Sequence, residues 1–172
     1  QNFEFIIIND CSTDNTLRII REYIQSDNRI KIIDNENNLK ISASLNKGIL
    51  SSKYNWLIRI DADDICLPDR LENTKYFIEN HPDVDIFGGG AIFIDNKGNF
   101  LQEFYPPISK EKINKRFFKA NPLIHPTVCM KKEKIIEIGL YNEYLKYGAE
   151  DYELWVRAWK KGLNIMNMNQ LL

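Results

Sequence analysis

Short apolar segments alternate with helix-forming segments along the first 80 residues of the chain. Apolar runs typical of buried strands lie at residues 3–8, 29–33 and 54–60. Helix signals follow each run, at residues 15–25, at the expected capping residue Ser42, and from Pro68 to about residue 80. A β-α-β-α-β-α order predicts parallel strands joined by right-handed crossovers. We therefore expect an α/β fold, a mostly parallel, Rossmann-like sheet in a three-layer α/β/α arrangement.

The pattern becomes more irregular after residue 82. Strands are expected at residues 84–94 and 100–105, a loop followed by a strand at residues 122–130, and helices at residues 110–119, 132–138 and 152–161. Gly88–Gly90 interrupt the first of these strands and lack the spacing of a phosphate-binding loop. A bulge, or the close approach of another backbone segment, is the better interpretation. Because no linker is visible, we expect one domain over residues 1–172, with a second half that begins near residue 83.

Composition limits the classes of protein to which the chain can belong. With 172 residues, 44% of them hydrophobic and 27% charged, it is long and apolar enough for a globular domain. The net charge of −1 implies no broad attraction to nucleic acid or to an anionic membrane. Three widely spaced cysteines predict a reducing, cytoplasmic setting. The chain opens almost directly in a strand and stops without a closing signal, so we expect a fragment of a longer protein.

Three carboxylates follow the third expected strand within four residues. Asp61, Asp63 and Asp64 should repel one another unless a cation lies between them. Such hard oxygen ligands suit Mg²⁺ or Mn²⁺, which commonly accompany a bound phosphate. A solvated acidic turn is the alternative. The position directly after a buried strand favours a binding site, because open α/β sheets bind ligands at the carboxyl ends of their strands.

Other candidate residues are more ambiguous when judged from their own surroundings. Asp10 ends the first strand and should face the same cleft as the acidic cluster, but a turn residue is an equally good interpretation. Asp69, early in a helix, is best explained by the helix dipole. The same explanation is the stronger one for Glu150 and Asp151 at the start of a later helix. His125, in a proline-flanked loop, is more often a structural residue than a catalytic one.

Four regions together resemble bacterial family 2 glycosyltransferases, which have the type A nucleotide-diphospho-sugar transferase (GT-A) fold. They are IINDCSTDNT at 7–16, SASLNKGI at 42–49, RIDADDICLPDRL at 59–71, and the pair NPLIHPTV at 121–128 and YGAEDYELWVR at 147–157. Each motif is modest by itself, whereas the ordered set is specific. The resemblance divides the chain into a nucleotide-sugar-binding half, to about residue 82, and an acceptor-binding half.

The resemblance implies a role for each residue that matches a family motif. On the donor side, Asp10 matches the acid that binds the nucleobase, and Asp61 lies near the ribose and phosphate. Asp63 matches the ligand of Mn²⁺ or Mg²⁺. Lys40 falls in the donor loop, where the family often has glycine. Asp151 matches the catalytic base, and the remaining two matching residues are expected on the acceptor side: Glu150 and His125.

The implied activity is an inverting, metal-dependent hexosyl transfer. The donor would be a nucleotide-diphospho-sugar, expected to be a UDP-sugar, and the acceptor a hydroxyl of a saccharide or lipid-linked saccharide in surface polysaccharide synthesis. No nucleic-acid partner is expected. The resemblance places the protein in the cytoplasm and allows peripheral association with the inner face of the membrane through segments outside this chain.

Departures from the family pattern keep two alternatives open. The family's opening strand and its P-x-Y-N segment are absent, its D-D-G-S motif is replaced by Asn9-Asp10-Cys11-Ser12, and the segment beyond residue 172 is missing. The fragment by itself is therefore expected to bind donor poorly or to be inactive. One alternative is a catalytically degenerate module that binds a nucleotide sugar. A nucleotidyltransferase is the other, although no glycine-rich basic loop is visible.

Overall fold

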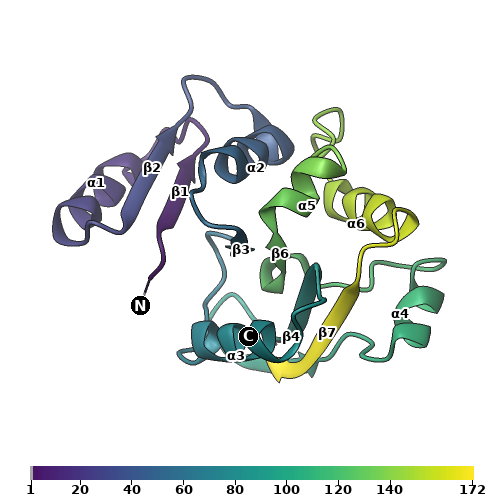
Figure 1. Cartoon of the computed structure of the whole chain (residues 1–172). Coiled ribbons are helices and arrows are strands. Elements are labelled where there is room, and N and C mark those ends of the chain that lie inside the picture. Colours follow the sequence, from purple (N-terminus) through teal and green to yellow (C-terminus); the bar gives the residue numbers. More distant parts are fainter. Residues whose placement is uncertain (1) are drawn as a thin grey trace. The chain divides into compact units, whose positions relative to one another are not determined.

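The computed structural model (Figure 1) describes residues 2–172. These residues fall into two units. One unit contains the chain up to Asn55 together with Gly139–Leu154, and the other contains Trp56–Ile138 with Trp155–Leu172. This grouping does not coincide with a boundary near residue 82. The assignment of donor and acceptor binding to separate halves stays a prediction.

The first unit is built on a parallel β-α-β element, as the sequence predicts. Strands β1 (Phe5–Asn9) and β2 (Ile30–Asp34) pair in parallel and are joined by helix α1 (Thr16–Ser26). Helix α2 (Lys40–Ser51) follows and approaches β1 closely. A Cβ atom at Gly48 would lie 2.6 Å from Ile8 Cδ1, so the glycine permits this approach.

The expected capping role of Ser42 is wrong. Helix α2 begins at Lys40, which places Ser42 inside its first turn, and the Ser42 hydroxyl donates a 2.7 Å hydrogen bond to the carbonyl oxygen of Leu145. Asn46, one turn later, donates to the Tyr141 carbonyl oxygen and accepts from the Tyr141 amide, both at 2.9 Å. These bonds fasten the distant segment 141–145 to α2. The Ser42 hydroxyl therefore bonds a residue that is distant in the sequence, whereas the local sequence pattern predicts that it caps the helix.

The second unit contains a mixed five-stranded sheet. The path is β3 (Trp56–Ile58), β6 (Cys129–Lys131), β4 (Ile86–Ile94) and β5 (Phe100–Phe104), and β7 (Ile165–Leu171) pairs with β4. Strand β7 runs parallel to β4, whereas β3–β6, β4–β6 and β4–β5 are antiparallel. The α/β class is confirmed, but the described pairs are less parallel than expected. Strand β7 was not predicted.

The remaining helices lie near their predicted positions. They are α3 (Arg70–Asn80), α4 (Lys110–Arg116), α5 (Lys132–Glu137) and α6 (Glu150–Lys160). The short 3₁₀ turn η1 (His125–Thr127), which was not predicted, lies in the expected loop before β6. Among residues 2–172, no helix combines the length and apolar character required to cross a membrane.

The core of the second unit lies around the centre of its sheet. Val84, Phe87, Cys129, Met168 and Leu172 are buried together there. The Trp56 ring meets the Phe87 ring edge-on, with centroids 5.9 Å apart. Because Met168 and Leu172 come from the end of the chain, β7 and the residue after it complete this core.

The three central glycines of β4 allow close backbone contacts. A Cβ atom at Gly89 would lie 2.9 Å from the Gln170 carbonyl oxygen, and one at Gly90 would lie 3.0 Å from the Phe104 carbonyl oxygen. The β4–β7 register also shifts between Gly88 and Gly90. Both the bulge and the close approach expected from the sequence are therefore confirmed.

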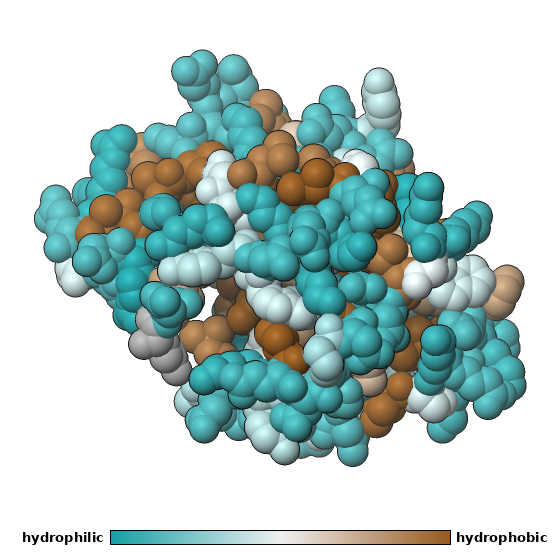
Figure 2. Space-filling view, viewed as in Figure 1, coloured by the Kyte–Doolittle hydropathy of each residue, from teal (hydrophilic) through white to brown (hydrophobic). Residues whose placement is uncertain are grey.

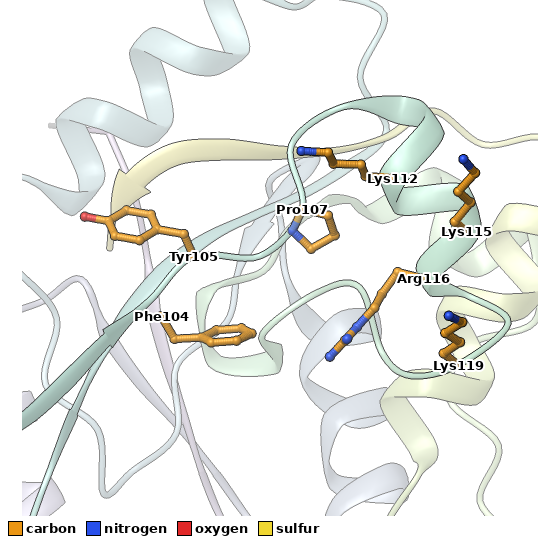
Figure 3. Close-up of a pocket in the computed structure, with 7 residues that line it drawn as sticks. All are labelled: Phe104, Tyr105, Pro107, Lys112, Lys115, Arg116 and Lys119. Carbon is orange, nitrogen blue, oxygen red and sulfur yellow. The ribbon is translucent and has the colours of Figure 1, made fainter.

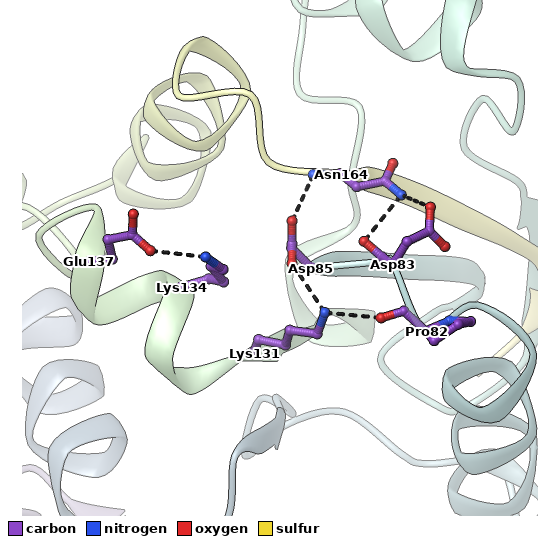
Figure 4. A network of polar contacts seen from close by, with 7 residues as sticks. All are labelled: Pro82, Asp83, Asp85, Lys131, Lys134, Glu137 and Asn164. Carbon is purple, nitrogen blue, oxygen red and sulfur yellow. Dashed lines mark hydrogen bonds and ion pairs between the residues drawn. The ribbon is translucent and has the colours of Figure 1, made fainter.

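A polar network fixes the start of β4 to both neighbouring strands (Figure 4). The Asp85 carboxylate accepts from Lys131 Nζ at 3.2 Å and from the Asn164 amide at 3.0 Å. The Asn164 side chain also donates to Asp83 at 2.9 Å. These bonds hold the end of β6 and the residue before β7 against β4, so we interpret this network as structural.

Candidate active site

The turn after β3 gathers the three carboxylates predicted from the sequence. Asp61, Asp63 and Asp64 each offer a carboxylate oxygen, and these oxygens all lie within 4.8 Å of one another. The Asp64 amide donates to the Asp61 carbonyl oxygen at 3.2 Å, which closes the turn. Asp63 and Asp64 are exposed, and Asp61 is half-buried.

Electrostatic crowding in this turn is visible at Asp64. Partial burial and the negative charges of Asp61 and Asp63 raise the pKa of the Asp64 carboxyl above its usual value. Closely spaced, hard oxygen donors that repel one another fit Mg²⁺ or Mn²⁺. The family resemblance assigns the metal to Asp63 alone, but the geometry makes Asp64 an equally placed candidate ligand.

Arg59 holds the Asp61 carboxylate from inside the protein. Its guanidinium group is buried and donates to both Asp61 oxygens, at 3.0 Å and 2.5 Å. Such two-point pairing fixes both the position and the plane of a carboxylate. Because Arg59 engages both oxygens of Asp61, the geometry distinguishes Asp61 from its two neighbours.

A second buried arginine supports the same turn. Arg70, the first residue of α3, is 3% exposed, and its Nη2 atom donates to the carbonyl oxygens of Arg59 at 2.5 Å and of Pro126 at 2.8 Å. Arg70 therefore ties the end of β3 to η1. Arg70 is not predictable as a site residue from the sequence, because its main partners are two backbone carbonyl groups and neither leaves a sequence signature.

His125 begins η1 and lies beside Trp155, with ring centroids 6.0 Å apart. Burial and the positive charge of Arg59 lower the pKa of His125 to about 2. The imidazole is therefore neutral at physiological pH and can accept or donate a hydrogen bond, but it supplies no positive charge.

Asp10 lies in the first unit and is held by three hydrogen bonds from the loop before α2. Its carboxylate accepts from the amides of Leu39 and Lys40, both at 2.8 Å, and from Asn35 Nδ2 at 2.9 Å. Burial by itself would raise the pKa of Asp10, but these donors lower it below its usual value. Asp10 therefore stays ionised, and a carboxylate with about four acceptor sites retains capacity for a further donor.

Two residues around Asp10 adopt backbone conformations that favour glycine. Cys11 has φ of 61° and Lys40 has φ of 70°. These are the positions at which the sequence analysis found Cys in place of the glycine of D-D-G-S, and Lys where the family often has glycine. The Lys40 amide, more than its side chain, reaches the site, since Lys40 Nζ lies 5.5 Å from the centre of the Tyr147 ring.

Glu150 and Asp151 open helix α6, and both residues belong to the first unit. Glu150 is buried, and the Asp151 carboxylate accepts from the Tyr152 amide at 2.7 Å. Acids in a first helical turn are stabilised by the helix dipole. Their catalytic and acceptor-side roles stay predictions.

The structure thus forms two local groups of predicted site residues. One contains the acidic turn, its two arginines and His125, and the other contains Asp10 and the backbone of Lys40. A cleft shared by Asp10 and Asp61 stays a prediction, because these residues belong to different units.

Comparison with known proteins identifies the family of this chain. The sequence pattern described as "Glycosyl transferase family 2" matches residues 1–139. An uncharacterised glycosyltransferase of Methanocaldococcus jannaschii is 41% identical over 160 residues, which are 92% of this chain and 54% of that protein. The Escherichia coli protein named UDP-Gal:alpha-D-GlcNAc-diphosphoundecaprenol beta-1,3-galactosyltransferase is 31% identical over 98% of this chain and 61% of its own length.

A solved structure shares the fold. S. aureus TarS 1-349 in complex with UDP-GlcNAc matches 98% of this chain and 47% of its own, with a TM-score of 0.75 and 21% identity. The chain spans less than two thirds of each relative described above. Because the family pattern covers most of the sequence, the chain belongs to glycosyltransferase family 2, with the type A fold.

Proposed function

We propose that the protein containing this chain transfers a sugar from a nucleotide-diphospho-sugar, most simply a UDP-sugar, to an acceptor hydroxyl. The acceptor is a saccharide or lipid-linked saccharide in surface polysaccharide synthesis. The triple carboxylate after β3, in a turn supported by two buried arginines, is the observation that carries the proposal. The name of the E. coli relative supports the donor and acceptor classes, since it contains a UDP-galactose donor and a diphosphoundecaprenol-linked acceptor.

The donor set of the acidic turn fits a divalent cation. Asp63 and Asp64 would hold it, because Arg59 already engages both oxygens of Asp61. When bound, Mn²⁺ or Mg²⁺ there would offset the negative charge that develops on the departing diphosphate. Asp61 would face the ribose and phosphate side of the donor.

Asp10 would bind the donor, and Asp151 would activate the acceptor. Asp10 would accept a hydrogen bond from the nucleobase. Its lowered pKa keeps the carboxylate ionised, which is the form that accepts. Asp151 would take the proton from the acceptor hydroxyl while the new bond to the anomeric carbon forms and the bond to the diphosphate oxygen breaks. Direct displacement without an enzyme nucleophile inverts the anomeric carbon. Glu150 and His125 would contact the acceptor.

Two substitutions in the complete protein test these roles. We expect Asp63→Ala and Asp151→Asn each to abolish sugar transfer. Asp151→Asn should retain binding of UDP and Mn²⁺ in calorimetry, because it leaves the acidic turn intact, whereas Asp63→Ala should weaken the Mn²⁺-dependent part of UDP binding. Asp69→Asn is the matched control, since Asp69 is exposed and its carboxylate accepts a hydrogen bond from its helix neighbour Asn73. Full turnover by Asp151→Asn would refute the base assignment.

One observation supports a second candidate function. Cys11 and Lys40 hold positive φ angles around Asp10, and such backbone strain costs of order 1–3 kcal/mol per residue. A degenerate site that binds a nucleotide sugar without transferring it would tolerate such departures. Binding of UDP with neither transfer nor hydrolysis of any UDP-sugar by the complete protein would favour this alternative.

A further inference from the structure

Helix α4 and the residues just after it concentrate positive charge. Residues 110–119 contain five basic side chains and one acidic side chain, a local net charge of +4 in a chain whose total is −1. The helix buries Ile113, and Phe117 is buried directly after it, while all five basic residues are exposed. The acidic residue, Glu111, lies 2.6 Å from Lys115 and offsets only one of these charges.

Most of this charge borders a pocket with an aromatic wall (Figure 3). The pocket has a volume of about 350 Å³. Phe104 and Tyr105, at the end of β5, line one side together with Pro107. Four cations from α4 and its end line the other side: Lys112, Lys115, Arg116 and Lys119. Cationic and apolar groups therefore meet at one surface.

The adjoining β4–β5 hairpin exposes large apolar side chains. Phe93 and Ile94 are 46% and 45% exposed, and Phe100 and Leu101 are 64% and 60% exposed. Phe118, which follows α4, is 77% exposed. Much of the surface visible in Figure 2 is hydrophilic, so this accumulation in one short stretch of the chain needs a physical explanation.

We propose that α4 and the β4–β5 hairpin form a docking surface for an anionic lipid bilayer. The lipid headgroup region offers phosphate oxygens directly above hydrocarbon, which matches cations beside exposed aromatic and aliphatic groups. Clusters of four to eight Lys or Arg residues attract anionic lipids in this way. A dissolved phosphate compound would engage the cations but would leave the hairpin side chains in water, so the bilayer is the better match.

This surface is distinct from the acidic turn and from Asp10, and it goes beyond the proposed sugar transfer. The net charge of −1 by itself implies no broad attraction to an anionic membrane, but it conceals the local excess of positive charge on α4. Membrane association would thus reside in this chain itself, in addition to any segments outside it.

Vesicle binding tests the proposal with the complete protein. We expect the wild type to sediment with phosphatidylglycerol-containing vesicles and not with pure phosphatidylcholine vesicles, and added salt should release it. The variant Lys112→Glu/Lys115→Glu/Lys119→Glu should bind the anionic vesicles at least about tenfold more weakly, since each cation near the surface contributes about fivefold in affinity and three are lost. Leu101→Ser/Phe118→Ser should also reduce binding, with less dependence on salt.

A matched control keeps the total charge change equal. Lys53→Glu/Lys75→Glu/Lys146→Glu alters three exposed lysines outside α4 and the hairpin and should bind within about twofold of the wild type. Thermal melting of each variant checks that it is folded. Equal binding to both vesicle types, unchanged binding of the Lys112 variant, or binding of pyrophosphate without binding of vesicles would each overturn the proposal. None of these measurements requires sugar transfer, so a negative result for vesicle binding would leave the proposed enzymatic function unaffected.

Discussion

Arg59 and Arg70 show how individual buried charges support an exposed acidic turn. Arg59 is 7% exposed and pairs with Asp61, and Arg70 is 3% exposed and binds two backbone carbonyl oxygens. Removing one partner of a buried, charged hydrogen bond leaves the other group without compensation. Arg70 should therefore position the acidic turn without contacting a ligand itself.

Replacement of Arg70 by methionine tests this role. Arg70→Met keeps the length of the side chain but leaves the Arg59 and Pro126 carbonyl oxygens without their donor, so we expect a loss of about 2–4 kcal/mol in the free energy of unfolding. Under conditions in which the variant remains folded, Mn²⁺-dependent binding of UDP should also weaken. Arg21→Met, at an exposed position of α1, should change stability by less than about 0.5 kcal/mol. Equal stability and equal Mn²⁺ dependence of Arg70→Met and wild type would contradict the positioning role.

At the scale of elements, the contact of β4 with β7 depends on Gly89. A methyl group there would meet Leu172 Cδ1 at 2.6 Å and the Gln170 carbonyl oxygen at 2.9 Å. The carbonyl oxygen belongs to the backbone of β7, so it cannot move away without shifting the strand. We expect Gly89→Ala to destabilise the protein by about 1–3 kcal/mol through overpacking, as measured by denaturant unfolding.

Gly48→Ala provides the matched comparison within helix α2. The added methyl group would meet only the side chain of Ile8, whose Cδ1 atom can rotate away, and alanine favours the helix by about 1 kcal/mol. This variant should be close to neutral. A larger loss of stability for Gly48→Ala than for Gly89→Ala would show that the β4–β7 contact is less constrained than the distances indicate.

Sequence patterns identified elements whose signal is local and missed those whose partners are distant. Continuous apolar runs correctly placed β1 and β2, and three neighbouring acids correctly indicated the cluster at the end of β3. Strand β7 was missed because asparagines interrupt its apolar residues. One of them, Asn167, is buried and bonds the carbonyl oxygens of Pro107 and Pro122. No sequence pattern reports such partners, and the same reason explains the missed arginines.

At the scale of the whole molecule, the distribution of charge matters more than its sum. The second unit contains both an acidic turn, where partial burial and the charges of Asp61 and Asp63 raise the pKa of Asp64, and the basic helix α4. The first unit contains carboxylates whose pKa is lowered, among them Asp10 and Glu4. Asp64 on one side, and Asp10 and Glu4 on the other, should therefore change the stability of the protein with pH in opposite directions.

Asp10 provides a test of how acid affects the stability of the molecule. Its folded-state pKa lies below the usual value of 3.8, because the hydrogen bonds from Leu39, Asn35 and Lys40 outweigh the effect of burial. The folded state therefore binds this proton less readily than the unfolded chain. Asp10 stabilises the protein fully above about pH 4, and the contribution is lost as the pH falls through the lower, folded-state pKa. We expect Asp10→Asn to reduce the free energy of unfolding at pH 7, and the difference from wild type to shrink steadily below pH 4.

Urea unfolding at a series of pH values measures this difference. Glu36→Gln is the control, because it neutralises an exposed carboxylate in the loop after β2 and should leave the pH profile of wild type almost unchanged. A difference between Asp10→Asn and wild type that stays constant down to pH 2 would mean that Asp10 acts through shape or neutral hydrogen bonding and not through its charge. In that case the ionised carboxylate that the proposed nucleobase contact requires would lose its support.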